Sequence, residues 1–288
     1  MPKFAEILYD SYGQEFRIDE MLYEVKTGHQ HLVIFHNAIF GRVLALDGIV
    51  QTTEKDEFIY HEMMTHVPVL AHGNAQRVLI IGGGDGGILR EVTRHRRVER
   101  ITQVEIDQQV IDMCRRYLPR HSAGAFDDAR LQVVIDDGFD FVRNCREQFD
   151  VIMCDSTDPI GPGAILFQEE FYAACHSCLA TGGIMVTQNG VAYMQLDEVK
   201  TTARRLDRLF GDWHFYSAAI PTYIGGIMAF GWASDNPDLR HTGLAELKSR
   251  LADEQIQTRY YNPEIHMAAF ALPQYIVDAI GKKDNEYH

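Results

Sequence analysis

RVLIIGGGDGGILRE, residues 77–91, is the stretch that decides the fold. It begins with an apolar run of strand length, and a run of glycines around one aspartate follows at once. A helical pattern of apolar residues opens at Ile88. Strand, glycine loop and helix in this order predict the first turn of a nucleotide-binding α/β sheet. The spacing G-x-G-x-x-G at Gly82, Gly84 and Gly87 is a weak signal alone, because glycine also serves merely to turn the chain at strand ends.

Length and composition limit the class of protein. The 288 residues can form one large domain or two unequal ones, and 46% hydrophobic with 24% charged residues is typical of a globular protein. The net charge of −14 argues against a nucleic-acid partner and weakly favours a cationic ligand. We expect no membrane span, because no apolar run approaches ~20 residues. The start, MPKFAEILYD, shows no signal peptide, so we expect a cytoplasmic protein.

No metal site is expected. The five cysteines are dispersed, which is typical of reduced and mostly buried thiols. Cys175 and Cys178 have C-x-x-C spacing, but their flanks predict one helix without a second ligand pair, so packing is the better interpretation. His61, Glu62 and His66 read H-E-x-x-x-H, and positions five apart do not share a helical face.

The first 53 residues predict a small β-domain. Strands are expected at 22–26, 31–35, 42–46 and 49–53, and Asp47-Gly48 is a strong hairpin signal. This block is too small for a large core and could serve as a lid, a dimer contact or both. Gln30 is either part of a solvated turn or a polar group that reaches a ligand from this domain. Thr53 is expected to cap a helix that runs towards Pro68, so residues 54–288 would form the second domain.

After the glycine loop the pattern alternates strictly between strands and helices. Strands are predicted at 100–105, 131–135, 149–154 and 183–187, and helices at 108–117, 139–145, 169–179 and 196–209. This alternation implies a parallel sheet with helices on both faces. The last two strands, 214–220 and 226–233, have no helix between them and must pair antiparallel. The fold class is therefore α/β, with a seven-stranded, methyltransferase-like (Rossmann-like) sheet.

Acidic residues stand where four strands end, at the edge where open α/β sheets bind ligands. Glu105 lies 23 positions after Gly82, close to the ~20 expected for a carboxylate that binds ribose hydroxyls. Asp137-Gly138 could cap a helix or meet an adenine amino group. Asp85 lies in the glycine loop, which no Lys or Arg faces, so phosphate is an unfavourable ligand. An uncharged or cationic adenosine compound, such as a sulfonium nucleoside, fits better than NAD.

The loop DSTDPIGPG, residues 155–163, is the most informative of these strand ends. Asp155 and Asp158 are three apart and precede a stretch rich in Pro and Gly. Because Pro fixes φ and Gly permits sharp turns, this loop has a defined shape and could close over a site. A surface loop with an acidic helix cap is the alternative, and the position at the end of a strand disfavours it.

The chain resembles the spermidine synthases (putrescine aminopropyltransferases) over essentially its full length. The matching segments are 28–30, 46–48, 51–53, 56–63, 82–87, 104–107, 155–163, 188–189, 221–223 and 260–262. The resemblance implies an N-terminal β-domain, a methyltransferase-like catalytic domain and a homodimer. It also implies transfer of an aminopropyl group from decarboxylated S-adenosylmethionine, a co-substrate rather than a cofactor, to putrescine. The products would be spermidine and 5′-methylthioadenosine.

The resemblance also assigns roles to particular residues. Asp155 would be the catalytic base, and Asp85 would meet the aminopropyl ammonium and repel the extra carboxylate of ordinary S-adenosylmethionine. The donor site would comprise Gln30, Gly82, Gly84, Asp85, Glu105, Asp137, Gly138 and Pro162. The amine channel would be lined by Tyr60, His61, Asp85, Asp155, Asp158 and Tyr223.

Three other functions remain open at this point. A methyltransferase that acts on a diamine would use the ordinary donor, and Asp85 argues against it. An aminopropyltransferase could prefer another acceptor, such as spermidine, cadaverine or agmatine. A catalytically silent polyamine or nucleoside sensor is disfavoured because Asp155, Asp158, Tyr60 and Tyr223 are all present.

Overall fold

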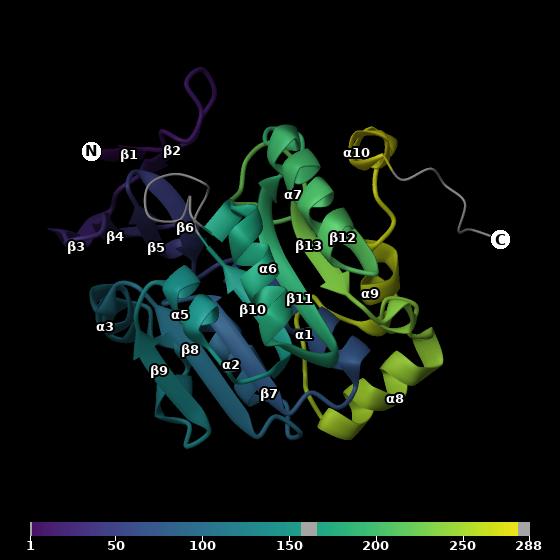
Figure 1. Ribbon diagram of the computed structural model, residues 1–288. Coiled ribbons are helices and arrows are strands. Elements are labelled where there is room, and N and C mark those ends of the chain that lie inside the picture. Colours follow the sequence, from purple (N-terminus) through teal and green to yellow (C-terminus); the bar gives the residue numbers. More distant parts are fainter. Residues whose placement is uncertain (1, 157–165, 282–288) are drawn as a thin grey trace.

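The computed structural model describes residues 2–156 and 166–281, and its larger sheet has seven strands within these ranges (Figure 1). The strand order is β12-β13-β11-β10-β7-β8-β9. These strands are β7 (Arg77–Gly82), β8 (Arg100–Glu105), β9 (Leu131–Ile135), β10 (Phe149–Asp155), β11 (Leu179–Val191), β12 (Asp212–Ala218) and β13 (Met228–Ser234). The strands from β7 to β11 pair in parallel, whereas β13 pairs antiparallel with β11 and β12. The predicted α/β class and methyltransferase-like sheet are confirmed.

Helices cover both faces of this sheet. The helices of the described chain are α1 (Glu57–His72), α2 (Gly87–Thr93), α3 (Gln108–Tyr117), α4 (Pro119–Ser122), α5 (Gly138–Asn144), α6 (Glu169–Cys178), α7 (Leu196–Leu209), α8 (Leu244–Glu254), α9 (Pro263–Ala269) and α10 (Gln274–Ile280). Side chains alternate across β7, as the pleat requires. Val78 and Ile80 pack with α1 and α2, whereas Leu79 and Ile81 pack with α5, α6 and α7. The apolar run of β7 is therefore buried on both sides.

A second, antiparallel sheet of four strands precedes α1. It contains β3 (Glu20–Lys26), β4 (His31–Asn37), β5 (Gly41–Leu46) and β6 (Ile49–Thr53), in that order, and β1 (Lys3–Ala5) pairs separately with β2 (Glu15–Arg17). The predicted hairpin at Asp47-Gly48 is confirmed, because β5 and β6 pair around it and both residues have positive φ. Leu32 and Leu44 of this small sheet pack against Val110 and Cys114 of α3, which joins the two sheets.

Three predicted boundaries were wrong by more than two residues. Thr53 does not cap α1, because the helix begins at Glu57 and the Thr53 hydroxyl instead donates to Asp56 Oδ1 at 2.6 Å. Pro68 does not end the helix, which continues to His72 because its residues from 59 to 71 are packed inside the protein. β11 extends well beyond 183–187, since it also pairs with β13 as far as Val191.

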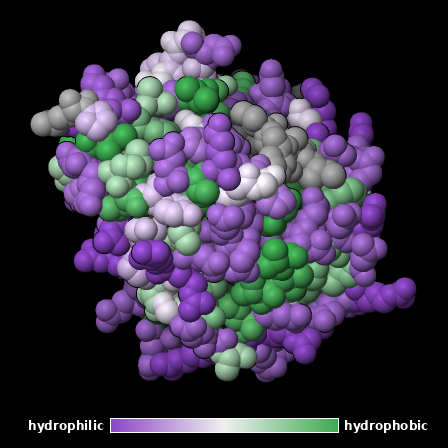
Figure 2. Space-filling model, turned by 90° about the vertical axis from the view of Figure 1, so that its left-hand side faces the viewer, coloured by the Kyte–Doolittle hydropathy of each residue, from purple (hydrophilic) through white to green (hydrophobic). Residues whose placement is uncertain are grey.

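The left side of Figure 1, turned to face the viewer in Figure 2, carries both the small sheet and the edge strand β9. Figure 2 shows hydrophobic side chains gathered on part of a mostly hydrophilic face. The edge strands β3 and β9 carry exposed apolar side chains: Met21 on β3, and Val133 and Ile135 on β9. The side therefore combines the open edges of both sheets with apolar groups.

The cysteines follow the prediction of reduced, mostly buried thiols. All five are free, four are buried and Cys145 is partly exposed. Cys175 and Cys178 lie on α6 and pack in the core. Within the described ranges, every helix is too short or too polar to cross a membrane.

Candidate active site

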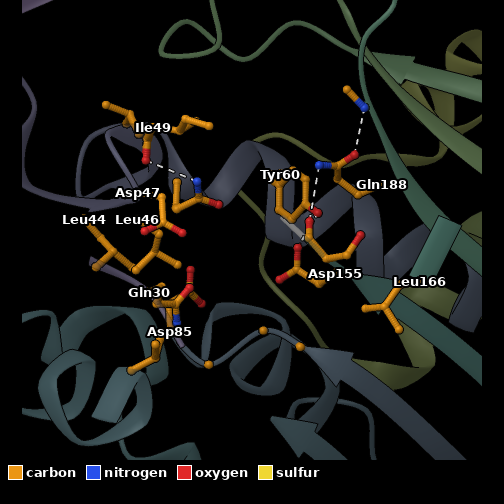
Figure 3. A pocket seen from close by; sticks show the side chains of 18 of the residues that line it. Gln30, Leu44, Leu46, Asp47, Ile49, Tyr60, Asp85, Asp155, Leu166 and Gln188 are labelled. Carbon is orange, nitrogen blue, oxygen red and sulfur yellow. Dashed lines mark hydrogen bonds between the residues drawn. The ribbon is translucent and has the colours of Figure 1, made fainter. Parts of the chain in front are cut away.

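A pocket opens at the carboxyl ends of β7, β8 and β10, where the fold rule places ligands (Figure 3). Its floor is the glycine loop, and its other walls come from the small sheet, α1 and the loop that follows residue 220. The pocket is lined by these predicted residues: Gln30, Tyr60, His61, Gly82, Gly84, Asp85, Glu105, Asp137, Gly138, Asp155 and Tyr223. Asp158 and Pro162 lie outside the described residues.

Gly82 brings the glycine loop into contact with the end of β10. Its φ is +83°, and a Cβ built there would lie 2.0 Å from the carbonyl oxygen of Asp155. Only glycine fits both the backbone conformation and the space. Gly82 is also the register partner of Asp155 in the parallel pair of β7 and β10. The first glycine of the motif therefore sets Asp155 directly beside the glycine loop.

Asp155 has an environment suited to proton transfer. Its Oδ1 accepts a hydrogen bond of 2.5 Å from the hydroxyl of Tyr60 on α1. Burial, followed by the negative charge of Asp85, raises the pKa of Asp155 to about 6. A carboxylate with a pKa closer to neutrality accepts a proton more readily than an ordinary aspartate.

Glu105 ends β8 and is buried at the rim of the glycine loop. Its Oε1 accepts the backbone N–H of Asp107 at 2.9 Å, and burial raises the pKa of Glu105 to about 7. Gln30 approaches from the small sheet, and its amide donates to Asp107 Oδ2 at 3.3 Å. Thr27 donates to the same oxygen at 2.7 Å. The turn at 27–30 is therefore bonded to the loop after β8, and it places Gln30 in the pocket wall.

Asp137 caps α5, as one of its two interpretations predicts. Its Oδ1 accepts the backbone N–H groups of Phe139 and Asp140 at 2.8 and 3.1 Å. Asp137 and Gly138 also line the pocket. Contact with an adenine amino group therefore stays a prediction.

The buried His61 and the partly buried Asp85 form a pair at the pocket wall. Asp85 Oδ1 accepts the N–H of Gly87 at 2.7 Å, and Asp85 Oδ2 lies 3.3 Å from His61 Nε2. The other ring nitrogen, Nδ1, lies 2.6 Å from Glu57 Oε2. Burial alone would lower the pKa of His61, but Asp85 and Glu57 outweigh it and raise the pKa to about 10. His61 therefore lines the pocket with both of its nitrogens directed at carboxylates.

His66, five positions further along α1, faces another part of the protein. Its two nitrogens lie 3.0 Å from His95 Nε2 and from Glu91 Oε2. His61 and His66 thus lie in different environments, as their spacing predicts. Among the described side chains, no three His, Cys, Asp or Glu are grouped as metal ligands would be.

Tyr223 is held in place by contacts with the last strand of the small sheet, β6, and with α1. Its hydroxyl donates to the carbonyl of Gln51 at 2.5 Å, and its ring lies edge-on to Tyr60 with centroids 6.2 Å apart. The preceding residue, Thr222, donates its N–H to Asp56 Oδ2 at 2.8 Å. These contacts place the two tyrosines on the same side of the pocket.

The N-terminal segment supplies pocket residues that the sequence did not predict. Glu6, Leu8 and Tyr9 line the pocket. Glu6 accepts the N–H of Val50 at 2.9 Å, and the Tyr9 hydroxyl donates to Gln195 at 3.4 Å. This segment has no periodicity or turn motif to mark it, so only the position of an acid near the first strand could have drawn attention to it.

Comparisons with known proteins agree with this geometry. A family model described as the spermine/spermidine synthase domain matches residues 57–242, and one described as the spermidine synthase tetramerisation domain matches residues 4–54. Polyamine aminopropyltransferase 1 of Pseudomonas aeruginosa is 65% identical over 99% of this chain and 100% of its own length. Polyamine aminopropyltransferase of Pseudomonas syringae pv. tomato is 62% identical over the same shares.

Solved structures agree as well. A spermidine synthase in complex with the transition-state analogue AdoDATO has a TM-score of 0.92 and 38% identity, with 97% of this chain and 95% of that chain covered. The spermidine synthase of Thermotoga maritima has a TM-score of 0.89 and 36% identity, with 97% and 94% covered. The chain therefore belongs to the spermidine synthase family of polyamine aminopropyltransferases, which are transferases.

Proposed function

We propose that this enzyme transfers the aminopropyl group of decarboxylated S-adenosylmethionine to putrescine and releases spermidine and 5′-methylthioadenosine. The observation that carries the proposal is the charge of the pocket. Its described lining contains six acidic residues and neither Lys nor Arg: Glu6, Asp47, Asp85, Glu105, Asp137 and Asp155. Such a site favours a sulfonium donor and a diamine, and it disfavours a phosphate-bearing cofactor such as NAD. We propose that no cofactor takes part.

The donor is assigned to the side of the pocket that holds the glycine loop. Glu105 would accept hydrogen bonds from the ribose hydroxyls, and Asp137-Gly138 would meet the adenine. Gln30 would close this part from the small sheet. Asp85 would accept the aminopropyl ammonium, and its charge disfavours the additional carboxylate of ordinary S-adenosylmethionine.

The acceptor is assigned to the side that holds the two tyrosines. A free alkylamine has a pKa near ~10.4, so only about one molecule in a thousand is a neutral nucleophile at pH 7. Desolvation and the nearby sulfonium would lower the amine pKa. Asp155, supported by Tyr60, would orient the amine and accept a proton as the C–N bond forms. The amine nitrogen attacks the propyl carbon next to sulfur, and the C–S electron pair leaves with methylthioadenosine.

The small sheet is assigned to self-association as a homodimer. Two observations support self-association, though not its order: the description of the family that matches residues 4–54, and the apolar groups on the side with the open edges of β3 and β9 (Figure 2). Light scattering after size exclusion would distinguish a dimer from the tetramer that the family description names. We place the enzyme in the cytoplasm, with small molecules rather than nucleic acid or membranes as its partners.

A mass-resolved assay tests the proposed reaction. Putrescine, cadaverine and spermidine are each offered with decarboxylated and with ordinary S-adenosylmethionine. We expect spermidine and methylthioadenosine from putrescine and the decarboxylated donor alone. A methylated amine from the ordinary donor would contradict both the reaction and the role of Asp85. Faster turnover of another amine would change the acceptor and leave the donor assignment intact.

A further inference from the structure

Behind Asp85, buried and partly buried groups of alternating charge run away from the pocket. Glu57 and His61 are one turn apart on α1, and Arg90 lies on α2. Glu57 Oε2 lies 2.6 Å from His61 Nδ1. The Arg90 guanidinium donates to Glu57 Oε2 at 2.8 Å and to Glu57 Oε1 at 3.2 Å. The side chains of Glu57 and His61 are only 7% and 2% exposed. The line of contacts therefore reads Arg90, Glu57, His61 and Asp85.

We propose that Arg90, Glu57 and His61 form a positioning chain that holds Asp85 as an ionised carboxylate at the pocket wall. The inference deepens the proposed function and rests on it, because a donor ammonium requires an ionised partner. It assigns a role to Glu57 and Arg90, which lie outside the pocket lining, and a new role to His61.

Charge explains why such a chain is needed. Asp85, Glu105 and Asp155 all line one pocket, and buried carboxylates that repel one another take up protons. Burial raises the pKa of both Glu105 and Asp155, and the charge of Asp85 raises the pKa of Asp155 further. The pKa of Asp85 changes in the opposite direction. Burial of Asp85 would raise this pKa, but the neighbouring His61 has the larger effect and lowers it below the ordinary value. Among these three carboxylates, a proton is therefore bound by Glu105 or Asp155 rather than by Asp85.

Geometry makes the chain rigid. Arg90 binds Glu57 with two nitrogens, and it also donates to Glu91 at 2.7 Å and to the carbonyl of His121 at 2.8 Å. A guanidinium held at several points cannot rotate away, as a lysine could. The third glycine of the motif completes the packing, since a Cβ on Gly87 would lie 2.1 Å from the His61 ring.

The remaining neighbours of His61 do not replace these partners. The His121 ring lies 6.0 Å away between centroids, and burial lowers the pKa of His121. The Tyr60 ring is edge-on to the His61 ring, with centroids 5.6 Å apart, and the Tyr60 hydroxyl donates its hydrogen bond to Asp155 rather than to His61. Glu57 and Asp85 are therefore the anions in direct contact with His61.

The first test reads the protonation state of His61 by nitrogen-15 NMR in the full-length protein without ligand. In the wild type, both ring nitrogens should keep the shifts of an imidazolium from pH 7 to pH 9. In Glu57→Gln, the titration midpoint of His61 should fall by about 1–3 pH units, which is typical for loss of a charge partner within hydrogen-bond distance. A neutral His61 at pH 7 in the wild type would overturn the proposal.

Glu62→Gln is the matched control for this test. Glu62 is buried on the same helix, but its carboxylate accepts the backbone N–H groups of residues 259–261, whereas the ring nitrogens of His61 face Glu57 and Asp85. Its substitution should destabilise the protein and leave the His61 midpoint in place. An equal shift of the His61 midpoint in both variants would mean that the effect is structural, and it would contradict the proposed positioning chain. If Glu57→Gln does not fold, Glu57→Gln with Arg90→Gln removes both charges and leaves no unpaired buried ion.

The second test links the chain to the donor. Calorimetry compares decarboxylated S-adenosylmethionine with methylthioadenosine, which lacks the ammonium, from pH 5 to pH 8. In the wild type the donor should keep its advantage over this whole pH range, because the pKa of Asp85 lies below it. In His61→Gln the donor should lose that advantage towards pH 5, because Asp85 then protonates more easily. An unchanged pH dependence would overturn the role of the chain. Absence of donor binding at every pH, with the NMR result intact, would instead contradict the proposed function.

Discussion

Removal of the Glu105 carboxylate should stabilise the ligand-free enzyme, and increasingly so as the pH rises. Glu105 is buried at the end of β8, and burial raises its pKa from 4.5 to about 7. The folded state therefore binds the Glu105 proton more tightly than the unfolded state does. This preference stabilises the protein fully below pH 4.5, and the stabilisation is lost as the pH rises through about 7.

The magnitude follows from the two pKa values. Between pH 5 and pH 8.5, a change from 4.5 to about 7 corresponds to about 2.5 kcal/mol of lost stability. Glu105→Gln has no carboxyl proton to lose, and its amide oxygen can still accept the N–H of Asp107. The stability of the variant relative to the wild type should therefore increase by that amount over this pH range.

Urea unfolding at the two pH values measures the difference directly. Glu99→Gln is the control, because Glu99 is an exposed carboxylate beside the opposite end of the same strand. Its effect on the free energy of unfolding should be the same at both pH values. With saturating methylthioadenosine, the wild type should become more stable than Glu105→Gln, since the proposed ribose contact needs the carboxylate.

Two results would refute this reasoning. If Glu105→Gln changes stability equally at both pH values, the carboxylate of the folded protein is not held in its protonated form. If the variant binds methylthioadenosine as tightly as the wild type, Glu105 does not bind the ribose, whatever its pKa.

Three further predictions concern the neighbouring residues. Gly82→Ala should cost about 2–5 kcal/mol in urea unfolding, because it combines a left-handed backbone with overpacking against Asp155; a loss below about 1 kcal/mol would mean that the strands can separate there. Asp155→Asn should lower turnover by about 10²–10⁴ while methylthioadenosine affinity stays unchanged, and equal losses of both would contradict its assignment as the base. Tyr60→Phe removes a hydrogen bond that lowers the pKa of Asp155, so the acid limb of the turnover profile should move to higher pH; an unmoved limb would separate Tyr60 from the proton transfer.

The sequence predicted the large sheet well because local signals and tertiary packing agree there. β8 and β9 have the predicted bounds, and α3 and α7 do as well. The acidic strand ends could be predicted for the same reason, since the carboxyl ends of parallel strands meet at one edge. The order of strands and helices alone was enough to bring Asp85, Glu105 and Asp155 together.

Other features depend on contacts that local patterns do not encode. Pro68 normally signals the end of a helix, but burial of the residues around it keeps α1 intact to His72. The hydroxyl of Thr53 bonds to Asp56 instead of to a helical N–H. Glu6 and Tyr9 reach the pocket through a segment with no regular pattern. The partners of His61 come from its own helix and from the glycine loop, and only the packing of the two brings them together.

The bonds from Thr27 and Gln30 to Asp107 have a mechanical consequence for the whole protein. They join the small sheet to the large one at the rim of the pocket, so a ligand there touches both sheets at once. A bound ligand should therefore stabilise the contact between the two sheets and slow proteolytic cleavage at the 27–30 turn. Substrate supply would then regulate the lifetime of the enzyme as well as its rate.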